Sequence, residues 1–547
     1  MNVVLRIGGT LVIAAALSAC SEPARQGQDV VEDERPNLLL IVVDDLGYTD
    51  LGSFGGEIAT PNLDGLARSG VRLTNFHSSA SCAPTRAMLM SGTDNHLAGM
   101  GTQGSLRTPG QADSPAYQNR LSADVDSLAA VLGSLGYRTY MTGKWHLGSD
   151  EGYLPNARGF DRSLALMPGG AGHFDHTPLV EALQSADWRL DDAPFTLPES
   201  FYSTTDLTDW MMRFVADGGE QDTRAPFFAY LAYTAPHWPI QAPDALLEKY
   251  RGAYSMGYDE LLEARMRGAA AAGVVAPAAQ PVRHTEGVPV WVSLSEDEKA
   301  GFVARMGAYA AMVDSIDQNV GRLLTYLEES DHLANTVVVF MSDNGAEGHA
   351  MEYLPSLAGW VEQTFDNTPA SIGTRRSYVT IGEGWARATA APFRLSKARV
   401  SEGGIRVPAF VHLPGEVRGS IDDAYMTVMD LAPTFVEIAG GEPRKQHRGR
   451  SLLSRWRGGS APVYDEEDVI AFEVYGRRAV QRGRYKALLM EPPFGTGDWQ
   501  LYDLRVDTGE QSDLSAELPD LRSELIELWE AYADEVGVIL PETPVIY

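Results

Sequence analysis

The sequence predicts an α/β fold, in which a mostly parallel sheet carries helices on both faces and a smaller α+β unit with an antiparallel sheet follows. Two observations predict it. From Pro36 onward, short apolar segments alternate with amphipathic helical segments. Near the C-terminus, several short apolar segments instead follow one another with only turns between them.

The large sheet is expected to contain two strands buried on both faces. The first is Asn37–Val43, "NLLLIVV", and the second is Thr336–Met341, "TVVVFM", each a continuous apolar run. A long amphipathic helix precedes the second strand, because apolar residues recur there at steps of three and four. These residues are Phe302, Met306, Tyr309, Val313, Ile316, Val320, Leu323 and Leu327.

The smaller unit is expected to consist of four antiparallel strands and a helix. The strands are "VIAFEVYG", "RRAVQRG", "YKALLM" and "WQLYDL". We therefore place a boundary near residue 460, between a large domain at 36–460 and a subdomain at 461–547. The alanine-rich stretch 268–281 is expected to be a surface excursion. The final helix carries one apolar stripe, formed by Leu521, Leu525, Trp529, Tyr532 and Val536.

The N-terminal segment predicts export. Residues 1–19 have one basic residue, an apolar run and small residues before Cys20, which is the layout of a secretory signal. "LSAC" resembles the bacterial lipobox, in which cleavage leaves a lipid-modified cysteine; an ordinary signal peptide is the alternative. Residues 20–35 form a polar tether. We expect an exported bacterial lipoprotein, held to a membrane through the lipid on Cys20, at the outer membrane and periplasm or at the cell surface.

The charge balance restricts the partners. The chain has 74 acidic and 44 basic side chains, and its formal net charge is −30. Such an excess of negative charge argues against nucleic acid as a partner. It also repels anionic substrates at long range, so any anion site must be locally basic.

Two acidic pairs follow the two buried strands. Asp44 and Asp45 come directly after the first strand, and Asp343 and Asn344 come after the second. Because ligands bind at the carboxyl ends of strands in open α/β sheets, both pairs are expected in one crevice. Oxygen ligands favour a hard cation, Ca²⁺ or Mg²⁺, over zinc. A single pair would be more typical of an ordinary turn; two pairs at equivalent positions favour the metal site.

Cys82 is the one cysteine beyond residue 20. With Cys20 assigned to lipid it has no disulfide partner in an oxidising compartment. Pro84 is typical of the first turn of a helix that runs to Gly92, which places Cys82 at the helix N-terminus. Arg86 adds a permanent charge one turn later. The sequence therefore predicts an anion site around position 82, with a buried structural cysteine as the alternative.

Four further residues are candidates only as a set. Lys144 and His146 in "TGKWHLG" lie two apart on an expected strand and hence on one face. His237 lies between prolines in "YTAPHWP", and Lys397 lies in "SKARVSEGGIRVP". Each alone is more typical of a surface or packing residue.

Taken together, these motifs resemble those of one family. "CAPTR" followed by "AMLMSG" resembles the maturation signature of type I sulfatases, and "VVDDLG", "TGKWHLG", "YTAPHWP", "MSDNG" and "SKARVSEGGIRVP" resemble the family's other motifs, in its order. The resemblance runs from Pro36 to the C-terminus and is closest to bacterial arylsulfatases of the alkaline-phosphatase-like fold. It implies that the large domain is the sulfatase catalytic domain.

The resemblance also implies a chemistry for position 82. In the family, this cysteine is oxidised to formylglycine by a formylglycine-generating enzyme. One hydroxyl of the hydrated aldehyde attacks the sulfur of a sulfate ester, and the other then expels sulfate from the covalent adduct. The implied substrate is a small-molecule or glycan sulfate ester.

The resemblance implies a role for each candidate residue. Asp44, Asp45, Asp343 and Asn344, with residue 82, hold the divalent cation, usually Ca²⁺, with Mg²⁺ as the alternative. Arg86 stabilises the hydrated aldehyde, and Lys144 and Lys397 bind sulfate oxygens. His146 takes the proton of the spare hydroxyl, and His237 lies near the leaving-group oxygen, assisted by Lys397.

Three other functions compete with this interpretation. Relatives with the same fold and modified cysteine hydrolyse phosphonate monoesters or phosphodiesters. A lipoprotein that only binds sulfated glycans would leave the metal and base residues without a purpose. A thiol hydrolase with Cys82 and a histidine base would leave the metal-type ligands unexplained.

Overall fold

The computed structural model describes residues 34–221, 225–282, 287–415 and 419–542, together with Met1, Leu5, Gly8, Gly9 and Val545. Cys20, most of the predicted signal and nearly all of the tether lie outside the described residues. Residues 35–547 group as one unit and residues 1–34 as another. Within the described part of the chain, none of the helices combines the length and the hydropathy that a membrane crossing needs.

A ten-stranded mixed sheet forms the centre of the large unit, in the order β11-β2-β10-β9-β1-β8-β4-β5-β6-β7. Five neighbouring strands from β9 to β5 run parallel, and β10, β2, β6 and β7 add antiparallel pairings at the two sides. This confirms the predicted mostly parallel sheet. The strands are β1 (Asn37–Val43), β2 (Val71–Leu73), β4 (Arg138–Lys144), β5 (Arg162–Leu166), β6 (Trp188–Leu190), β7 (Ala193–Pro194), β8 (Phe227–Ala232), β9 (Thr336–Ser342), β10 (Ala409–His412) and β11 (Ser420–Asp422). A separate two-stranded pair joins β3 (Phe76–His77) to β12 (Met426–Thr427).

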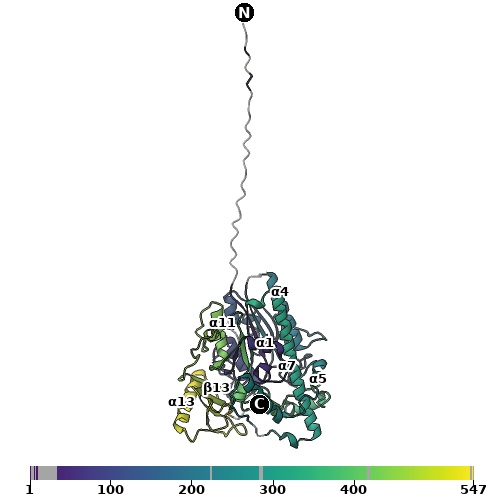
Figure 1. Cartoon of the computed structure of the whole chain (residues 1–547), viewed down its shortest axis with the longest axis vertical. Coiled ribbons are helices and arrows are strands. Elements are labelled where there is room, and N and C mark those ends of the chain that lie inside the picture. The colour runs from purple at the N-terminus through teal and green to yellow at the C-terminus, as the bar shows by residue number, and fades with distance from the viewer. Residues whose placement is uncertain are drawn as a thin grey trace. The chain divides into compact units, whose positions relative to one another are not determined.

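Helices cover both faces of this sheet, because successive side chains of each strand point to opposite faces. Along β1, Leu39 and Ile41 belong to one apolar core, and Leu38 and Leu40 belong to the other. The first core contains residues of α1 (Pro61–Ser69), α4 (Ser203–Gln221) and α7 (Glu296–Glu329). The second contains residues of α2 (Cys82–Ser91), α3 (Leu128–Ser134) and α11 (Leu431–Ile438). Figure 1 shows α7 and α11 on opposite sides of the strands.

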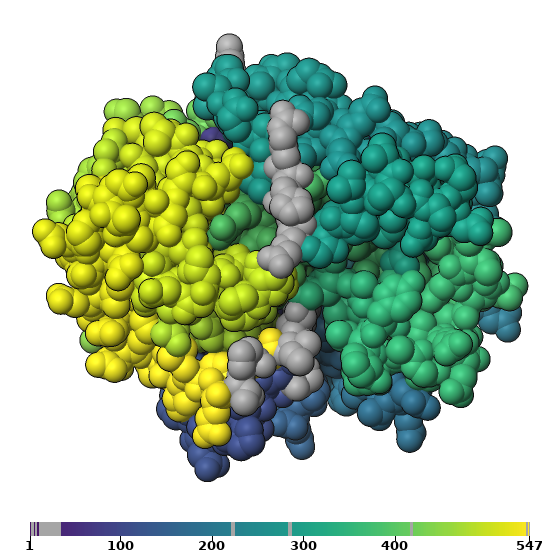
Figure 2. Space-filling model, turned by 90° about the horizontal axis from the view of Figure 1, so that it is seen from below, coloured from purple at the N-terminus to yellow at the C-terminus, as the bar shows by residue number. Residues whose placement is uncertain are grey.

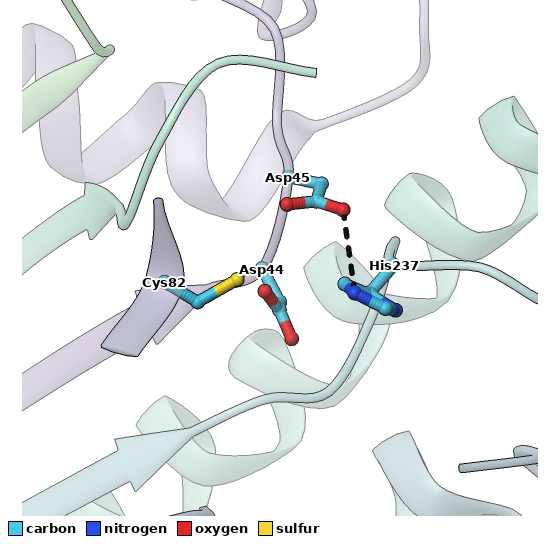
Figure 3. A group of neighbouring side chains, drawn as sticks. All are labelled: Asp44, Asp45, Cys82 and His237. Atoms are coloured by element: carbon cyan, nitrogen blue, oxygen red, sulfur yellow. Dashed lines mark ion pairs between the residues drawn. The ribbon is translucent and has the colours of Figure 1, made fainter. Parts of the chain in front are cut away.

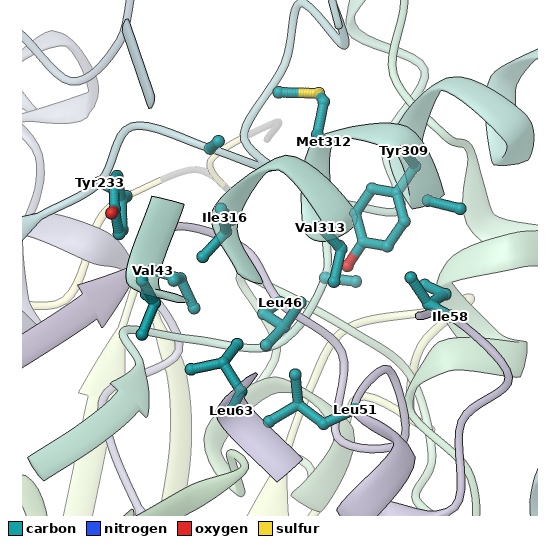
Figure 4. Packing of buried hydrophobic residues seen from close by; sticks show 14 of the residues in the cluster. Val43, Leu46, Leu51, Ile58, Leu63, Tyr233, Tyr309, Met312, Val313 and Ile316 are labelled. Atoms are coloured by element: carbon teal, nitrogen blue, oxygen red, sulfur yellow. The ribbon is translucent and has the colours of Figure 1, made fainter. Parts of the chain in front are cut away.

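The long helix α7 confirms the predicted stripe. Ser295 caps its first turn, and Glu298 returns a side-chain bond to the backbone of Ser295, which forms a capping box. Every residue of the stripe except the partly exposed Phe302 is buried. Figure 4 shows Val313 and Ile316 of this helix packed near Val43 of β1. Burial of each such side chain stabilises the fold by roughly 1.5–3 kcal/mol.

The predicted surface excursion at 268–281 is wrong in its first third. Residues 268–272 end the helix α6 (Tyr258–Ala272), and Ala269 is fully buried. The helix approaches the backbone at Gly55 so closely that a Cβ on Gly268 would lie 2.1 Å from the Gly55 carbonyl oxygen. Small residues here therefore serve close packing rather than a loop.

The predicted antiparallel sheet and final helix are observed near the C-terminus. The strands β13 (Val469–Val474), β14 (Arg477–Arg482), β15 (Tyr485–Leu489) and β16 (Gln500–Asp503) pair in order, and α13 (Pro519–Val536) packs on one face through Leu525 and Trp529. The other face joins a cluster that contains Ala80, Leu395 and Ala398 of the large sheet's loops. Figure 2 shows the C-terminal residues, in yellow, on the same face as the teal segment, with a hollow between them. The domain boundary near residue 460 stays a prediction.

Candidate active site

Four adjacent parallel strands bring several of the predicted residues to one edge of the sheet. The strands β9, β1, β8 and β4 lie side by side. Val43 at the end of β1 pairs with Ser342 at the end of β9, so Asp44 and Asp343 follow at the same level. Lys144 is the last residue of β4, and His237 lies in the segment after β8. This edge is the position at which open α/β sheets bind ligands.

Cys82 is the first residue of α2, as the sequence predicted, and Gly92 ends the helix with a left-handed φ of 66°. The side chain is buried, with an exposed fraction of 1%. Ligand atoms of Cys82, Asp44, Asp45 and His237 all lie within 4.8 Å of one another. Figure 3 shows the sulfur directed toward the two carboxylates, with His237 on their far side.

Three buried cations face the acidic residues. Lys144 Nζ lies 2.6 Å from Asp44 Oδ2, and Lys397 Nζ lies 2.9 Å from the Asp45 carboxylate. Arg86 donates from Nη2 and Nε to Asp343 Oδ2, at 2.7 and 3.0 Å. Arg86 therefore engages a predicted metal ligand in addition to its place one turn after Cys82.

Arg86 is fixed by two further bonds. Its Nη1 donates to the Lys144 carbonyl at 3.0 Å and to the Tyr230 hydroxyl at 3.3 Å. Tyr230 lies on β8, so helix α2 is tied to two strands of the sheet through one side chain. A planar guanidinium with five donors suits this task better than a lysine.

The carboxylates repel one another despite these cations. Burial raises the pKa of Asp45 to about 8; Lys397 opposes this rise, and Asp44, Glu347 and Asp343 add to it. Burial acts on Asp44 in the same direction, but Lys144 and Arg86, with Lys397, hold its pKa below the usual value. An additional cation beside Asp45 would lower the pKa of that residue and favour the ionised carboxylate.

Two oxygens of this set lack a hydrogen-bond partner in the protein. Asp44 Oδ1 and Asn344 Oδ1 are buried and accept no hydrogen bond. The Asn344 amide nitrogen donates to Asp45 Oδ1 at 2.6 Å, which fixes the amide beside the carboxylates. Orphan carboxylate and amide oxygens in a buried site fit a hard cation. The compact group around Cys82 also includes His237, which the sequence had placed at the leaving group and not at the metal.

His146 does not lie on the strand. The strand β4 ends at Lys144, and His146 follows in a left-handed conformation with φ of 57°. The prediction that Lys144 and His146 share one face of a strand is therefore wrong, because the chain turns between them. Burial, followed by Lys144 and Arg86, lowers the pKa of His146 well below its usual value, so the ring is neutral.

His237 is held by its neighbours. Its ring stacks on Trp238, with centroids 5.2 Å apart, and its Nδ1 lies 2.5 Å from the Trp238 carbonyl oxygen. Because a carbonyl only accepts, this contact places the proton on Nδ1. Nε2 faces Asp45 Oδ2 at 3.7 Å. Burial and then Lys397 lower the pKa of His237 well below its usual value.

The structure adds residues that sequence reasoning missed. Glu347 Oε2 lies 3.5 Å from Lys397 Nζ, so this lysine contacts two carboxylates. Gly169 lies against His146, where a Cβ would come within 2.6 Å of the ring, and a Cβ on Gly170 would lie 3.1 Å from the His237 ring. The signals available were the acidic residue three positions after Asn344 and the "PGG" turn after β5, which are too common to single out.

Cys82 itself is a poor nucleophile as a thiol. Burial, opposed by Lys144 and Lys397, raises its pKa to about 12. Nucleophilic cysteines depend on the thiolate, which is scarce at such a value near neutral pH. This disfavours the thiol hydrolase among the competing functions.

Comparison with known proteins identifies the family of this chain. The sulfatase family model matches residues 36–441. The chain belongs to the sulfatase family. An uncharacterized sulfatase of Schizosaccharomyces pombe is 38% identical over 531 residues, which cover 93% of this chain and 95% of that protein. An arylsulfatase of Klebsiella aerogenes is 36% identical over 444 residues, covering 80% of this sulfatase and 94% of the relative.

Solved structures agree on the fold. Ps i-CgsB, solved alone and with a neocarrahexaose, aligns with a TM-score of 0.65 and 25% identity over 91% of this chain and 93% of its own. A phosphonate monoester hydrolase of Agrobacterium radiobacter aligns with a TM-score of 0.56 and 20% identity, over 92% of this chain and 96% of its own. At this identity, the similarity shows a shared fold only. The protein therefore has the alkaline-phosphatase-like fold, and its family supports sulfate ester hydrolysis.

Proposed function

We propose that this sulfatase is an arylsulfatase, which hydrolyses sulfate monoesters to a phenol or alcohol and sulfate with formylglycine formed from Cys82 and a bound Ca²⁺. The observation that carries the proposal is the buried group of Cys82, Asp44, Asp45 and His237 within 4.8 Å. The arylsulfatase relative at 36% identity favours aryl esters over other sulfate esters.

The cation would be held by Asp44, Asp45, Asp343 and Asn344, together with residue 82. Ca²⁺ suits this set better than Mg²⁺, because Mg²⁺ usually keeps several waters and these ligands lie in a fully buried site. When bound, the ion supplies positive charge beside the sulfuryl oxygens. Lys144 and Lys397 add two ammonium groups at the same edge, which gives the acidic chain the locally basic site that an anionic ester needs.

The hydrated aldehyde at position 82 would supply two hydroxyls on one carbon, one that attacks sulfur and one whose ionisation releases sulfate. Arg86, fixed by Asp343 and Tyr230, stabilises this group. His146 accepts the proton of the second hydroxyl, since its lowered pKa keeps the ring neutral and able to accept.

The leaving group would depart beside His237 and Lys397. His237 holds its proton on Nδ1 toward the Trp238 carbonyl, so Nε2 donates only when the ring is doubly protonated. When the His237 ring is neutral, the Lys397 ammonium group, which has three N–H donors, would donate to the leaving-group oxygen instead. Trp238 packs with Tyr378 in an apolar cluster that includes Met351. An aromatic leaving group would suit the apolar residues beside His237.

Maturation and export would precede catalysis. Cys82 is buried in the folded chain, so a formylglycine-generating enzyme would act on the unfolded segment around it. The predicted lipid on Cys20 would then hold the sulfatase to a membrane, at the outer membrane and periplasm or at the cell surface, where small aryl sulfates or sulfated glycans are accessible.

Parallel kinetics test the proposal. An aryl sulfate, a phosphate diester, a phosphonate ester and a sulfated oligosaccharide are compared by kcat/KM with the matured enzyme. We expect the aryl sulfate to give the highest value. A phosphorus substrate with a much higher value would make the protein a phosphonate or phosphodiester hydrolase, and tight glycan binding without turnover of any ester would make it a binding protein.

A further inference from the structure

The turn between β13 and β14 contacts two catalytic segments of the large sheet. The side chains involved are Tyr475, in the turn, and Arg477, the first residue of β14. Tyr475 contacts the residue before Cys82, and Arg477 contacts the residue after Lys397. We call residues 473–477 the β13–β14 turn. It belongs to the C-terminal sheet and lies almost 400 residues from Cys82 in sequence.

The first contact fixes Ser81. The hydroxyls of Tyr475 and Ser81 share a hydrogen bond of 2.7 Å, and Gln103 Nε2 donates to the same serine oxygen at 2.6 Å. Ser81 occupies the N-cap position of α2, yet its side chain makes no capping bond. A serine at this position usually caps its own helix. Here its hydroxyl instead ties the first residue before Cys82 to the C-terminal sheet.

The tyrosine is held in an unfavourable backbone conformation. Tyr475 has φ of 60°, in the left-handed region, and Gly476 follows with φ of 89°. Two-residue hairpin turns of this kind favour Asn or Gly at the first position, and a bulky residue there is strained. Such strain is typical of positions kept for function. The side chain is buried, with 5% exposed, beside Ala80 and Ala398.

The second contact fixes the segment of Lys397. Arg477 Nη1 donates to the Ala398 carbonyl at 2.5 Å, and Arg477 also pairs with Glu491 at 2.6 Å. Ala398 is also in the strained left-handed region, with φ of 69°. Its amide donates to the Ala80 carbonyl at 2.7 Å. The backbone segments that carry Cys82 and Lys397 are thus hydrogen-bonded to each other, and each is also hydrogen-bonded to the β13–β14 turn.

We infer that the β13–β14 turn positions residue 82 and Lys397 relative to each other, with Tyr475 and Arg477 as positioning residues for the proposed sulfatase reaction. Neither side chain needs to touch the substrate. Displacement of a reacting group by about 1 Å lowers rates by as much as 10²-fold, so a loosened turn affects turnover more than binding. The inference rests on the proposed function, because it assigns Lys397 to the leaving group.

Two substitutions with matched controls test it. Tyr475→Phe removes one hydroxyl, and Tyr502→Phe does the same in a buried tyrosine of the same apolar cluster. Arg477→Gln removes the bond to Ala398, and Arg482→Gln alters an arginine at the other end of β14 that pairs with the exposed Glu524. Formylglycine content is measured first and should be unchanged, because the maturation signal around Cys82 is proposed to be read in the unfolded chain and lies far in sequence from these positions.

We expect Tyr475→Phe to lower kcat about tenfold for every ester, with KM and melting temperature close to those of Tyr502→Phe. Arg477→Gln should lower kcat/KM more for esters of poor leaving groups than for esters of good ones, whereas Arg482→Gln should follow the wild type. A merely structural role would not change the dependence on the leaving group. Wild-type kcat and leaving-group dependence in both variants would overturn the inference while the proposed function stands.

A second measurement does not depend on activity. In protein made without the maturation enzyme, Cys82 is a thiol, and its alkylation by iodoacetamide is followed by peptide mass spectrometry. We expect Cys82 to react several-fold faster in Tyr475→Phe than in the wild type or in Tyr502→Phe. Equal rates would overturn the positioning of residue 82. If the wild type hydrolyses no sulfate ester, the proposed function fails, and this measurement still decides whether the turn fixes position 82.

Discussion

Lys144 Nζ lies 2.6 Å from Asp44 Oδ2, and both side chains are fully buried. A buried pair of this kind is costly to break, because the remaining charge keeps no partner. Asp44 is also one of the proposed cation ligands, so this lysine links the sulfate site to the metal site.

Lys144→Met should therefore lower kcat/KM for an aryl sulfate by about 10²- to 10³-fold, the usual effect of removing one group that stabilises transition-state charge. Lys299→Met is the matched control, since Lys299 pairs with the exposed Glu296 at the surface. Steady-state kinetics of both variants check this. Equal activity in the two variants would remove Lys144 from the sulfate site.

Gly169→Ala should lower activity by about tenfold or more, because the added Cβ would lie 2.6 Å from the His146 ring and displace it. Gly65→Ala is the control: Gly65 lies in α1 with open space around its Cβ position, and the substitution should stabilise the fold by about 0.5–1 kcal/mol. Kinetics and thermal unfolding are measured for both. Full activity of Gly169→Ala would show that His146 tolerates displacement.

Metal removal should abolish turnover. Prolonged treatment with EDTA is expected to inactivate slowly, because the candidate ligands Asp44, Asp343 and Asn344 have no exposed surface. Ca²⁺ should restore activity better than Mg²⁺. Activity is followed together with metal content, and full turnover by a sample shown to contain no divalent metal would contradict the cation's role.

His96 should make stability depend on pH. Burial disfavours its charged form, but hydrogen bonds to Asp94 and Glu473 outweigh burial and raise its pKa to about 9, from 6.5. Because the folded-state pKa is the higher one, the stabilisation is complete below pH 6.5 and is lost as the pH rises through about 9. The excess of the wild type over His96→Gln in free energy of unfolding should therefore fall by on the order of 3 kcal/mol between low and high pH. Chemical denaturation at pH 6 and pH 10 measures the difference; a difference that stays constant would contradict the assignment.

The sequence allowed the metal-type ligands to be predicted because their position follows from a general rule. Asp44 and Asp343 directly follow buried parallel strands, and the ends of such strands meet at one edge of the sheet. The position of Cys82 at the start of a helix could also be predicted, since Pro84 and Gly92 mark the two ends of that helix. These predictions needed only local pattern and one rule of topology.

The remaining features depend on tertiary packing. The left-handed φ of His146 is imposed by the turn after β4 and has no local signal. Glu347 looks like an ordinary loop carboxylate until Lys397 is brought beside it. Tyr475 and Arg477 come from a sheet whose strands were predicted, but nothing in "VYGRR" indicates that this turn reaches Ser81 and Ala398.

The proposed mechanism requires that position 82 is not a thiol in the working enzyme. Peptide mass spectrometry of the active, naturally matured protein tests it most directly, with an aldehyde-reactive hydrazine as a second label for the same peptide. We predict that the peptide containing position 82 has the mass of an aldehyde in place of CH₂SH and reacts with the hydrazine. An intact thiol at position 82 in every molecule of a fully active preparation would contradict the formylglycine mechanism.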